Sequence, residues 1–297
     1  MTPAALRQLL RVPERPVVTE RVIVRAVEDA DGIATETLTL DLGDGRRARA
    51  FVTRPSEPAG RRPAVLYCHA HGARYEIGAS ELTDGRPSLL GPYGPLLARR
   101  GFVTLCLDMP AFGERADEKE DALSKALLWQ GRTLMGEMLA DLLAGFDYLS
   151  SRADVDPDRI AAFGLSMGAT HAYFLGAIEP RIARVAHLCC FADLATLIET
   201  GAHDLHGHYM TIPGLLAQTS FGRIAGMIAP RPQLICTGAK DPLTPPAAVE
   251  KALAECQPAY RAAGAEAGLR HVSEPDTGHV ETPAMREAVL AFLDGMR

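Results

Sequence analysis

The segment Gly164-Leu165-Ser166-Met167-Gly168 lies between a mainly apolar run at residues 159–163 and a helix-like run at residues 169–175. We predict a buried strand before the serine and a helix after it. A strand-to-helix turn this tight leaves no room for side chains at Gly164 and Gly168, so it requires glycine at both positions. It would expose the Ser166 hydroxyl at the carboxyl end of a sheet, beside a helix N-terminus. The same residues also suit an ordinary Gly/Ser turn, so the rest of the chain must decide.

A serine hydroxyl becomes a good nucleophile only when a base takes its proton, typically a histidine oriented by a carboxylate. We predict Asp241 as the acid because it comes directly after the apolar strand candidate at residues 233–237. We predict His279 as the base because it lies in a loop between a strand candidate at 269–273 and a terminal helix at 283–296. The chain order Ser, Asp, His is the one that a serine on such a turn requires.

Other residues compete for these roles. Asp193 is a second candidate acid because it follows a strand candidate at 186–191. We expect His171 in a helix and His187 in a strand, which suits them less well as bases. Each also has an interpretation without a catalytic role. Asp241 would then be a residue of a surface turn, and His279 a residue of a solvated loop.

A further motif follows the strand candidate at residues 63–67, where His71-Gly72 leads into Ala73. In hydrolases with a nucleophilic serine, one backbone donor for the developing oxyanion comes from such a turn and another from the residue after the serine. We therefore predict the amides of Ala73 and Met167 as the oxyanion hole. The pair His69 and His71 could instead bind a metal, but no further ligand stands at a consistent spacing.

In these motifs the chain resembles the α/β-hydrolase superfamily, and most closely its branch of dienelactone hydrolases and acetyl xylan esterases. The motifs run in order from about residue 60 to the C-terminus: His71-Gly72, residues 108–114, residues 164–168, Pro230-Arg231-Pro232, residues 238–241 and Gly278-His279. The resemblance implies a triad of Ser166, Asp241 and His279 that needs no cofactor and no metal. Dienelactone hydrolases use a cysteine nucleophile, so the serine here favours a carboxylic ester as substrate.

The pattern of strands and helices predicts an α/β fold in one domain over residues 1–297. Residues 35–41 and 47–53 alternate with period two around a Gly43-Asp44-Gly45 turn, which predicts an antiparallel hairpin at the sheet edge. After residue 63, apolar strands alternate with helices such as 134–149. This indicates a mostly parallel central sheet with helices on both faces.

Composition excludes several classes of protein. The chain has 297 residues, of which 47% are hydrophobic, and a net charge of −6 without a basic stripe, which argues against nucleic-acid binding. It has no long apolar segment, so we expect neither a signal peptide nor a membrane span. The six cysteines stand mostly in apolar patterns, which favours reduced thiols and a cytoplasmic location. The sequence leaves the oligomeric state open, a homo-oligomer included.

Two stretches, residues 111–131 and 192–222, are candidate lid insertions because each follows a predicted strand. If they fold over Ser166, their apolar side chains would form a substrate pocket. Arg74 and Tyr75, beside the predicted oxyanion turn, could orient a polar or anionic group. The second stretch is rich in histidine, which could bind metal but suits polar contacts within a lid better. The pocket candidates are Trp129, Tyr209, Met210 and Phe221.

These patterns predict a serine hydrolase that cleaves a small-molecule carboxylic ester through an acyl-enzyme. A lactonase, thioesterase, peptidase or acyltransferase could use the same three residues. A ligand-binding protein without catalysis is a further alternative, since a fold does not by itself determine a function.

Overall fold

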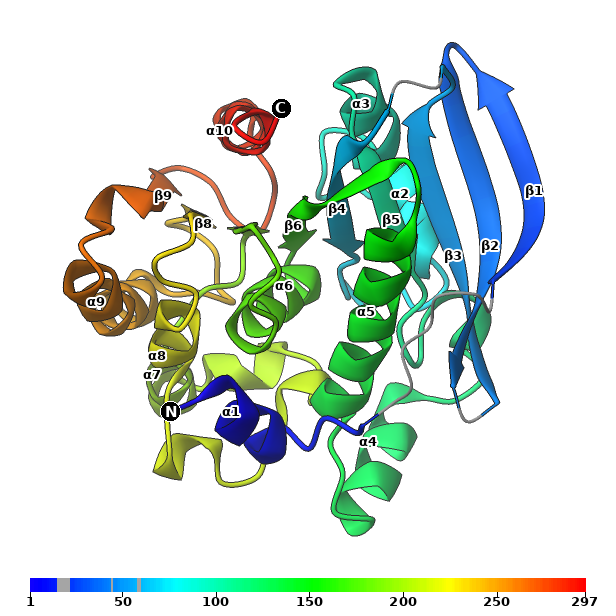
Figure 1. Cartoon of the computed structure of the whole chain (residues 1–297). Helices are drawn as coiled ribbons and strands as arrows, with labels where there is room; N and C mark the ends of the chain where they lie inside the picture. Colours follow the sequence, from blue (N-terminus) through cyan, green and yellow to red (C-terminus); the bar gives the residue numbers. More distant parts are fainter. Residues whose placement is uncertain (15–21, 44, 58–59) are drawn as a thin grey trace.

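The computed structural model describes residues 1–14, 22–43, 45–57 and 60–297 (Figure 1). The tip of the predicted hairpin turn, Asp44, lies outside these residues. The chain begins with a short helix, α1 (Pro3–Leu9). It starts after Thr2, whose side chain accepts a hydrogen bond from the amide of Ala5.

Within the described residues, nine strands form one sheet in the order β1-β2-β3-β5-β4-β6-β7-β8-β9. Strands β4 to β9 are parallel to one another, whereas β1, β2 and β3 are antiparallel to their neighbours. The strands are β1 (Val22–Ala30), β2 (Ile33–Gly43), β3 (Arg46–Pro55), β4 (Arg62–Cys68), β5 (Val103–Leu107), β6 (Val155–Leu165), β7 (Arg184–Leu188), β8 (Gln233–Gly238) and β9 (Leu269–Glu274). The predicted hairpin is β2–β3, but β1 and not the hairpin occupies the outer edge of the sheet (Figure 1).

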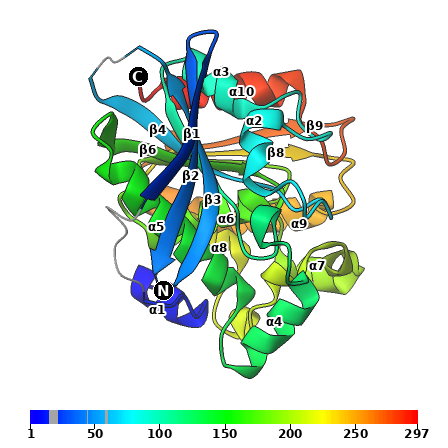
Figure 2. The ribbon, with the colours of Figure 1, turned by 90° about the vertical axis from the view of Figure 1, so that its right-hand side faces the viewer.

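Helices cover both faces of the sheet, as the alternating pattern predicted (Figure 2). One face carries α3 (Tyr93–Arg99) and α10 (Pro283–Asp294), and the other carries α5 (Leu134–Ser151), α6 (Met167–Ile178) and α8 (Phe221–Gly226). The remaining helices are α2 (Glu81–Asp84), α4 (Glu120–Trp129), α7 (Leu194–Thr200) and α9 (Pro246–Ala262). In the described part of the chain, no helix has both the length and the apolar character needed to cross a bilayer.

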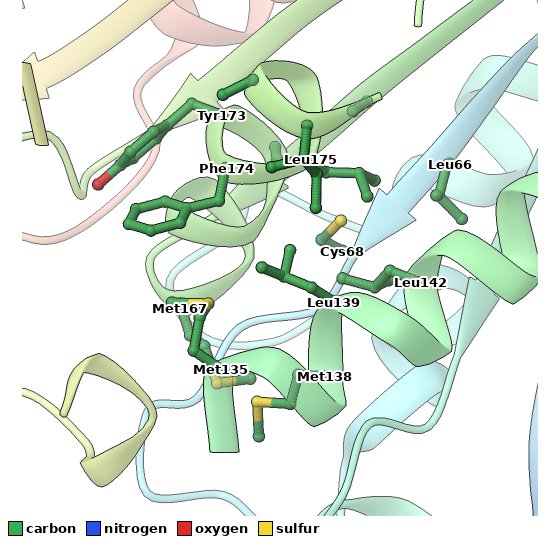
Figure 3. Close-up of a cluster of buried hydrophobic side chains, with 14 of the residues drawn as sticks. Leu66, Cys68, Met135, Met138, Leu139, Leu142, Met167, Tyr173, Phe174 and Leu175 are labelled. Atoms are coloured by element: carbon green, nitrogen blue, oxygen red, sulfur yellow. The ribbon is translucent and has the colours of Figure 1, made fainter. Parts of the chain in front are cut away.

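The core is divided between the two faces because successive side chains of a strand point in opposite directions. In β4, Leu66 and Cys68 belong to the cluster under α5 and α6, whereas Val65 and Tyr67 belong to the cluster under α3 and α10. Figure 3 shows the first cluster, where side chains of α5 and α6 gather around the end of β4. The end of β4 and the helix α6 are therefore both anchored in packed core.

The two candidate lids are built mainly of short helices. Residues 111–131 follow β5 and contain a 3₁₀ turn, η2 (Gly113–Arg115), and then α4. Residues 192–222 follow β7 and contain α7, three 3₁₀ turns and the first residues of α8. The 3₁₀ turns are η3 (Ala202–Leu205), η4 (His208–Met210) and η5 (Leu215–Ala217). Both segments therefore begin at the carboxyl end of the parallel strands, where α/β proteins place their sites.

Candidate active site

Ser166 stands alone between β6 and α6, with φ 57° and ψ −121°. This is a conformation that residues with a side chain rarely adopt, and it turns the chain from strand to helix in one residue. The sharp turn at residues 164–168 is called the elbow. A Cβ at Gly164 would lie 2.5 Å from the carbonyl oxygen of Cys68, and a Cβ at Gly168 would lie only 1.9 Å from the same oxygen. The requirement for glycine at both positions is confirmed, because β4 passes directly against the elbow.

The three residues predicted as a triad meet in space although they are far apart in sequence. The Oγ of Ser166 lies 2.8 Å from Nε2 of His279, and Nδ1 of His279 lies 2.7 Å from Oδ2 of Asp241. A carboxylate can only accept, so Nδ1 carries the proton and Nε2 is free to accept the hydroxyl proton of Ser166. The arrangement has the geometry of a nucleophile, a base and an orienting acid.

The turn after β8 holds Asp241 in place. Its side chain is fully buried, and its second oxygen accepts a hydrogen bond of 2.9 Å from the amide of Leu243. A Cβ at Gly238 would lie 2.4 Å from the carbonyl oxygens of Thr277 and Gly278, so the end of β8 touches the loop that carries His279. This close approach brings the acid and the base together.

The second candidate acid, Asp193, has a different role. It caps α7 by accepting a 2.8 Å hydrogen bond from the amide of Thr196, and it pairs with Lys251 at 2.8 Å. A carboxylate committed to a helix N-terminus and a lysine does not orient His279.

The loop of His279 is fixed by Glu281, which sequence reasoning missed. The Glu281 carboxylate is buried and accepts hydrogen bonds from the amide of Leu90 at 2.9 Å, from the guanidinium of Arg286 at 2.7 Å and from the hydroxyl of Tyr93. It therefore ties this loop to the segment before α3. Its position two residues after the base was the one signal available in the sequence.

The other buried histidines are unsuited to act as bases. Burial lowers the pKa of His69 to about 3, that of His171 to about 4 and that of His187 to about 3. His171 lies in α6 and His187 in β7, as predicted. Nδ1 of His171 lies 2.8 Å from the carbonyl oxygen of Met167, so this ring supports the start of α6.

One of the two predicted oxyanion donors makes a hydrogen bond within its own turn. The amide of Ala73 donates a 2.9 Å hydrogen bond to Nδ1 of His71, so this donor is already used within its own turn. Among the described residues, neither the amide of His71 nor that of Gly72, which both lie closer to β4, donates a hydrogen bond. Met167 begins α6, and an amide in the first turn of a helix has no partner within that helix. The amides left available in this region are therefore those of His71 and Gly72 in the turn after β4 and that of Met167 at the start of α6.

Two of the predicted substrate contacts are otherwise engaged, and a third lies on the surface. Arg74 is exposed and pairs with Glu76, and the hydroxyl of Tyr75 donates to Glu120 at 3.0 Å. Trp129 is 88% exposed at the end of α4, so it does not line an enclosed pocket. Its place after a run of charged residues could not distinguish an outward-facing tryptophan from a buried one.

Tyr209, Met210 and Phe221 are all buried. The ring of Tyr209 lies 5.5 Å from that of His171 and 6.2 Å from that of His71, so η4 lies over the elbow and the turn after β4. Met210 faces another way, into a hollow of about 440 Å³ that is lined by residues of the 192–222 segment.

The histidine-rich part of the 192–222 segment makes polar contacts. His206 Nε2 lies 2.9 Å from the carbonyl oxygen of Leu243, and burial lowers the pKa of His206, so the neutral ring donates this bond. The segment is thereby attached to the turn that carries Asp241. Among the described residues, no group of three or more His, Cys, Asp or Glu side chains has an arrangement that could hold a metal ion.

Comparison with known proteins identifies a family whose sequences resemble this chain. Residues 95–294 match the sequence profile of the Prolyl oligopeptidase family. The chain is 36% identical over 280 residues to YtaP of Bacillus subtilis (strain 168), a protein named only as a hydrolase, and the match covers 94% of this chain and 92% of YtaP.

Solved structures with a similar fold include two proteins named for esterase activities. The Bacteroides fragilis NCTC 9343 protein BF1801, assigned as an acetyl xylan esterase, has a TM-score of 0.76 at 16% identity, over 99% of this chain and 87% of that chain. The glucuronoyl esterase from Solibacter usitatus has a TM-score of 0.72 at 13% identity, over 99% and 92%. At these identities the likeness concerns the fold, and it confirms the predicted α/β-hydrolase architecture.

Proposed function

This chain belongs to the prolyl oligopeptidase family of serine hydrolases within the α/β-hydrolase superfamily, and on that basis we propose that it hydrolyses small carboxylic esters through an acyl-enzyme on Ser166. The observation that carries the proposal is the continuous pair of contacts from Ser166 Oγ to His279 and from His279 to Asp241, at 2.8 and 2.7 Å.

In the proposed reaction, Nε2 of His279 takes the hydroxyl proton as Ser166 Oγ attacks the ester carbonyl. The histidine then gives this proton to the departing alkoxide, and the acyl group stays on the serine. A water molecule, activated by the same nitrogen, attacks the acyl-enzyme and releases the acid. Asp241 holds the ring in the required tautomer and stabilises its cation.

We assign the developing oxyanion to the amides of Met167 and His71. Both are backbone donors held by the fold, so they do not have to reorganise when the charge develops. Removing one such donor in a studied enzyme lowered the rate by about 10²–10³-fold, so we expect the pair to contribute strongly to catalysis.

Restricted access to Ser166 favours a small substrate. The serine is only 7% exposed, and buried Tyr209 of the 192–222 segment covers the elbow region. We propose that this segment and the 111–131 segment act as lids. A long peptide would need an open groove along both sides of the serine, whereas a short acyl ester needs only a narrow opening.

The test is a panel of p-nitrophenyl esters with acyl chains of increasing length, measured beside a thioester, a lactone and a peptide p-nitroanilide. We expect the highest kcat/KM for the shortest esters and no turnover in Ser166→Ala, which keeps the wild-type circular dichroism. A preference for the anilide would replace the esterase proposal by a peptidase. Normal turnover in Ser166→Ala would refute the nucleophile itself.

A further inference from the structure

A single buried carboxylate, that of Glu120, joins the turn after β4 to both lid segments. Glu120 is the first residue of α4 and is 3% exposed. Its Oε2 lies 2.6 Å from Nε2 of His71 and accepts a 3.0 Å hydrogen bond from the hydroxyl of Tyr75. Its Oε1 accepts a 3.2 Å hydrogen bond from the amide of Tyr209 in η4. The carboxylate is therefore the point at which these three segments of the chain meet.

The direction of these bonds fixes the proton on His71. Because Nδ1 of His71 accepts the amide of Ala73, the ring proton must be on Nε2, where it is donated to Glu120. Each of the three described groups that contact the Glu120 carboxylate is thus a donor. Burial acts to raise the pKa of Glu120, but the bonds from His71, Tyr75 and the Tyr209 amide outweigh it and lower that pKa overall.

The backbone of the 192–222 segment comes unusually close to this pair. A Cβ at Gly207 would lie 2.8 Å from Oε1 of Glu120 and 2.8 Å from Nε2 of His71. The ring of His71 is also enclosed by aromatic rings, with its centroid 5.1 Å from that of Tyr75 and 5.2 Å from that of Phe112. The turn that carries the unpartnered His71 amide therefore has little freedom while both segments are closed.

We propose that Glu120 is a positioning residue for the reaction: through His71 it holds the turn that supplies an oxyanion donor, and it does so only when both lid segments are closed. This inference rests on the proposed function. Closure would then complete the oxyanion hole, so that a bound substrate and a competent site occur together.

A positioning role and a purely structural role predict different kinetics. An oxyanion contact forms only in the transition state, so disturbing it lowers kcat and kcat/KM by the same factor and leaves KM unchanged. Loosening the lids without moving the donor would instead raise KM.

The first variant is Glu120→Gln, which keeps the size of the side chain but presents an amide to three donors. We expect kcat to fall by about tenfold to a hundredfold, less than for deletion of a donor, with KM unchanged. The matched control is Glu118→Gln, an exposed carboxylate two residues earlier, for which we expect wild-type kinetics. Gly207→Ala disturbs the same pair from the opposite side without removing either partner, so it provides a second test should Glu120→Gln fold poorly.

A double-mutant cycle identifies the route of the effect. His71→Phe keeps an aromatic ring and removes both nitrogens. If Glu120 acts through His71, the loss caused by Glu120→Gln falls to less than about twofold in this background. An equal loss in both backgrounds, or a change in KM alone, would overturn the inference.

The rate of Ser166 labelling by a fluorophosphonate gives a readout that needs no ester turnover, because the phosphoryl oxygen occupies the same oxyanion hole. We expect the labelling rate constant to fall in Glu120→Gln and Gly207→Ala but not in Glu118→Gln. If the wild type labels at Ser166 but hydrolyses none of the esters, the esterase proposal fails while the Glu120 inference is still tested. Equal labelling rates in Glu120→Gln, Gly207→Ala and Glu118→Gln would overturn it.

Discussion

Replacing Gly168 by alanine tests how closely catalysis depends on the contact between β4 and the elbow. The new Cβ would lie 1.9 Å from the carbonyl oxygen of Cys68 and 2.9 Å from that of His69. Both are backbone atoms, so no side chain can rotate away. Real Cβ atoms essentially never come within 3.0 Å of a heavy atom outside their own residue and its chain neighbours. The end of β4 and the start of α6 must therefore separate by about 1.1 Å.

This displacement predicts a loss of both activity and stability. The end of β4 leads directly into the His71 turn, so a movement of this size takes the proposed donor away from Ser166. A misplacement of about 1 Å can cost about 100-fold in rate, and overpacking of a tight contact costs about 1–3 kcal/mol.

The assay measures kcat/KM for p-nitrophenyl acetate, together with the free energy of unfolding in urea. Gly268→Ala is the control, because its Cβ would meet nothing closer than the carbonyl oxygen of Pro230 at 3.6 Å. We expect Gly268→Ala to behave as wild type in both measurements. Folded Gly168→Ala protein that retains activity within threefold of wild type would show that the donor does not depend on this contact.

Three further predictions concern the acid, a buried ion pair and the thiols. Asp241→Asn should lower kcat by about 10⁴-fold with little change in melting temperature, because the amide favours the wrong tautomer of His279; a loss under tenfold would argue against its role. Burial acts to raise the pKa of Glu36, but hydrogen bonds from Arg152 at 2.8 Å and Arg54 at 2.7 Å lower it overall. Glu36→Gln should therefore cost about 1.5–3 kcal/mol in denaturant unfolding at pH 7, and the difference should shrink as the pH falls below about 4.3; a difference that does not depend on pH would contradict this reasoning. All six cysteines are free and buried, so a thiol reagent such as DTNB should react with none of them in the native protein and with all six after unfolding; rapid reaction of any native thiol would show that the core is more open than described.

Much of the fold could be predicted because the strands after residue 63 are short, apolar and separated by helices. The elbow at Ser166 was also predictable, since Gly164 and Gly168 are placed where the chain cannot carry a side chain. Asp241 could be proposed as the acid from its position after a buried strand, but Asp193 shares this feature, and the structure shows what separates the two. Each stands at the carboxyl end of a strand, but only Asp241 faces the loop of His279.

The support around the site could not be predicted in the same way. Glu120 stands in a run of charged residues that is typical of a solvated surface, and its partner His71 lies 49 residues away. The local sequence pattern also could not show that the His71 ring accepts a hydrogen bond from the Ala73 amide, because this bond depends on the ring orientation that Glu120 imposes. The exposure of Trp129 could not be predicted for a related reason, since an apolar residue at a helix end can face either way.

The most direct test of the central claim is to map the residue that reacts covalently. The folded protein is treated with a fluorophosphonate and digested, and the modified peptide is identified by mass spectrometry. We predict one adduct, on Ser166, which is absent in Ser166→Ala and forms far more slowly in His279→Ala. An adduct on another residue, or none on the folded wild-type protein, would contradict the assignment of Ser166 as an activated nucleophile.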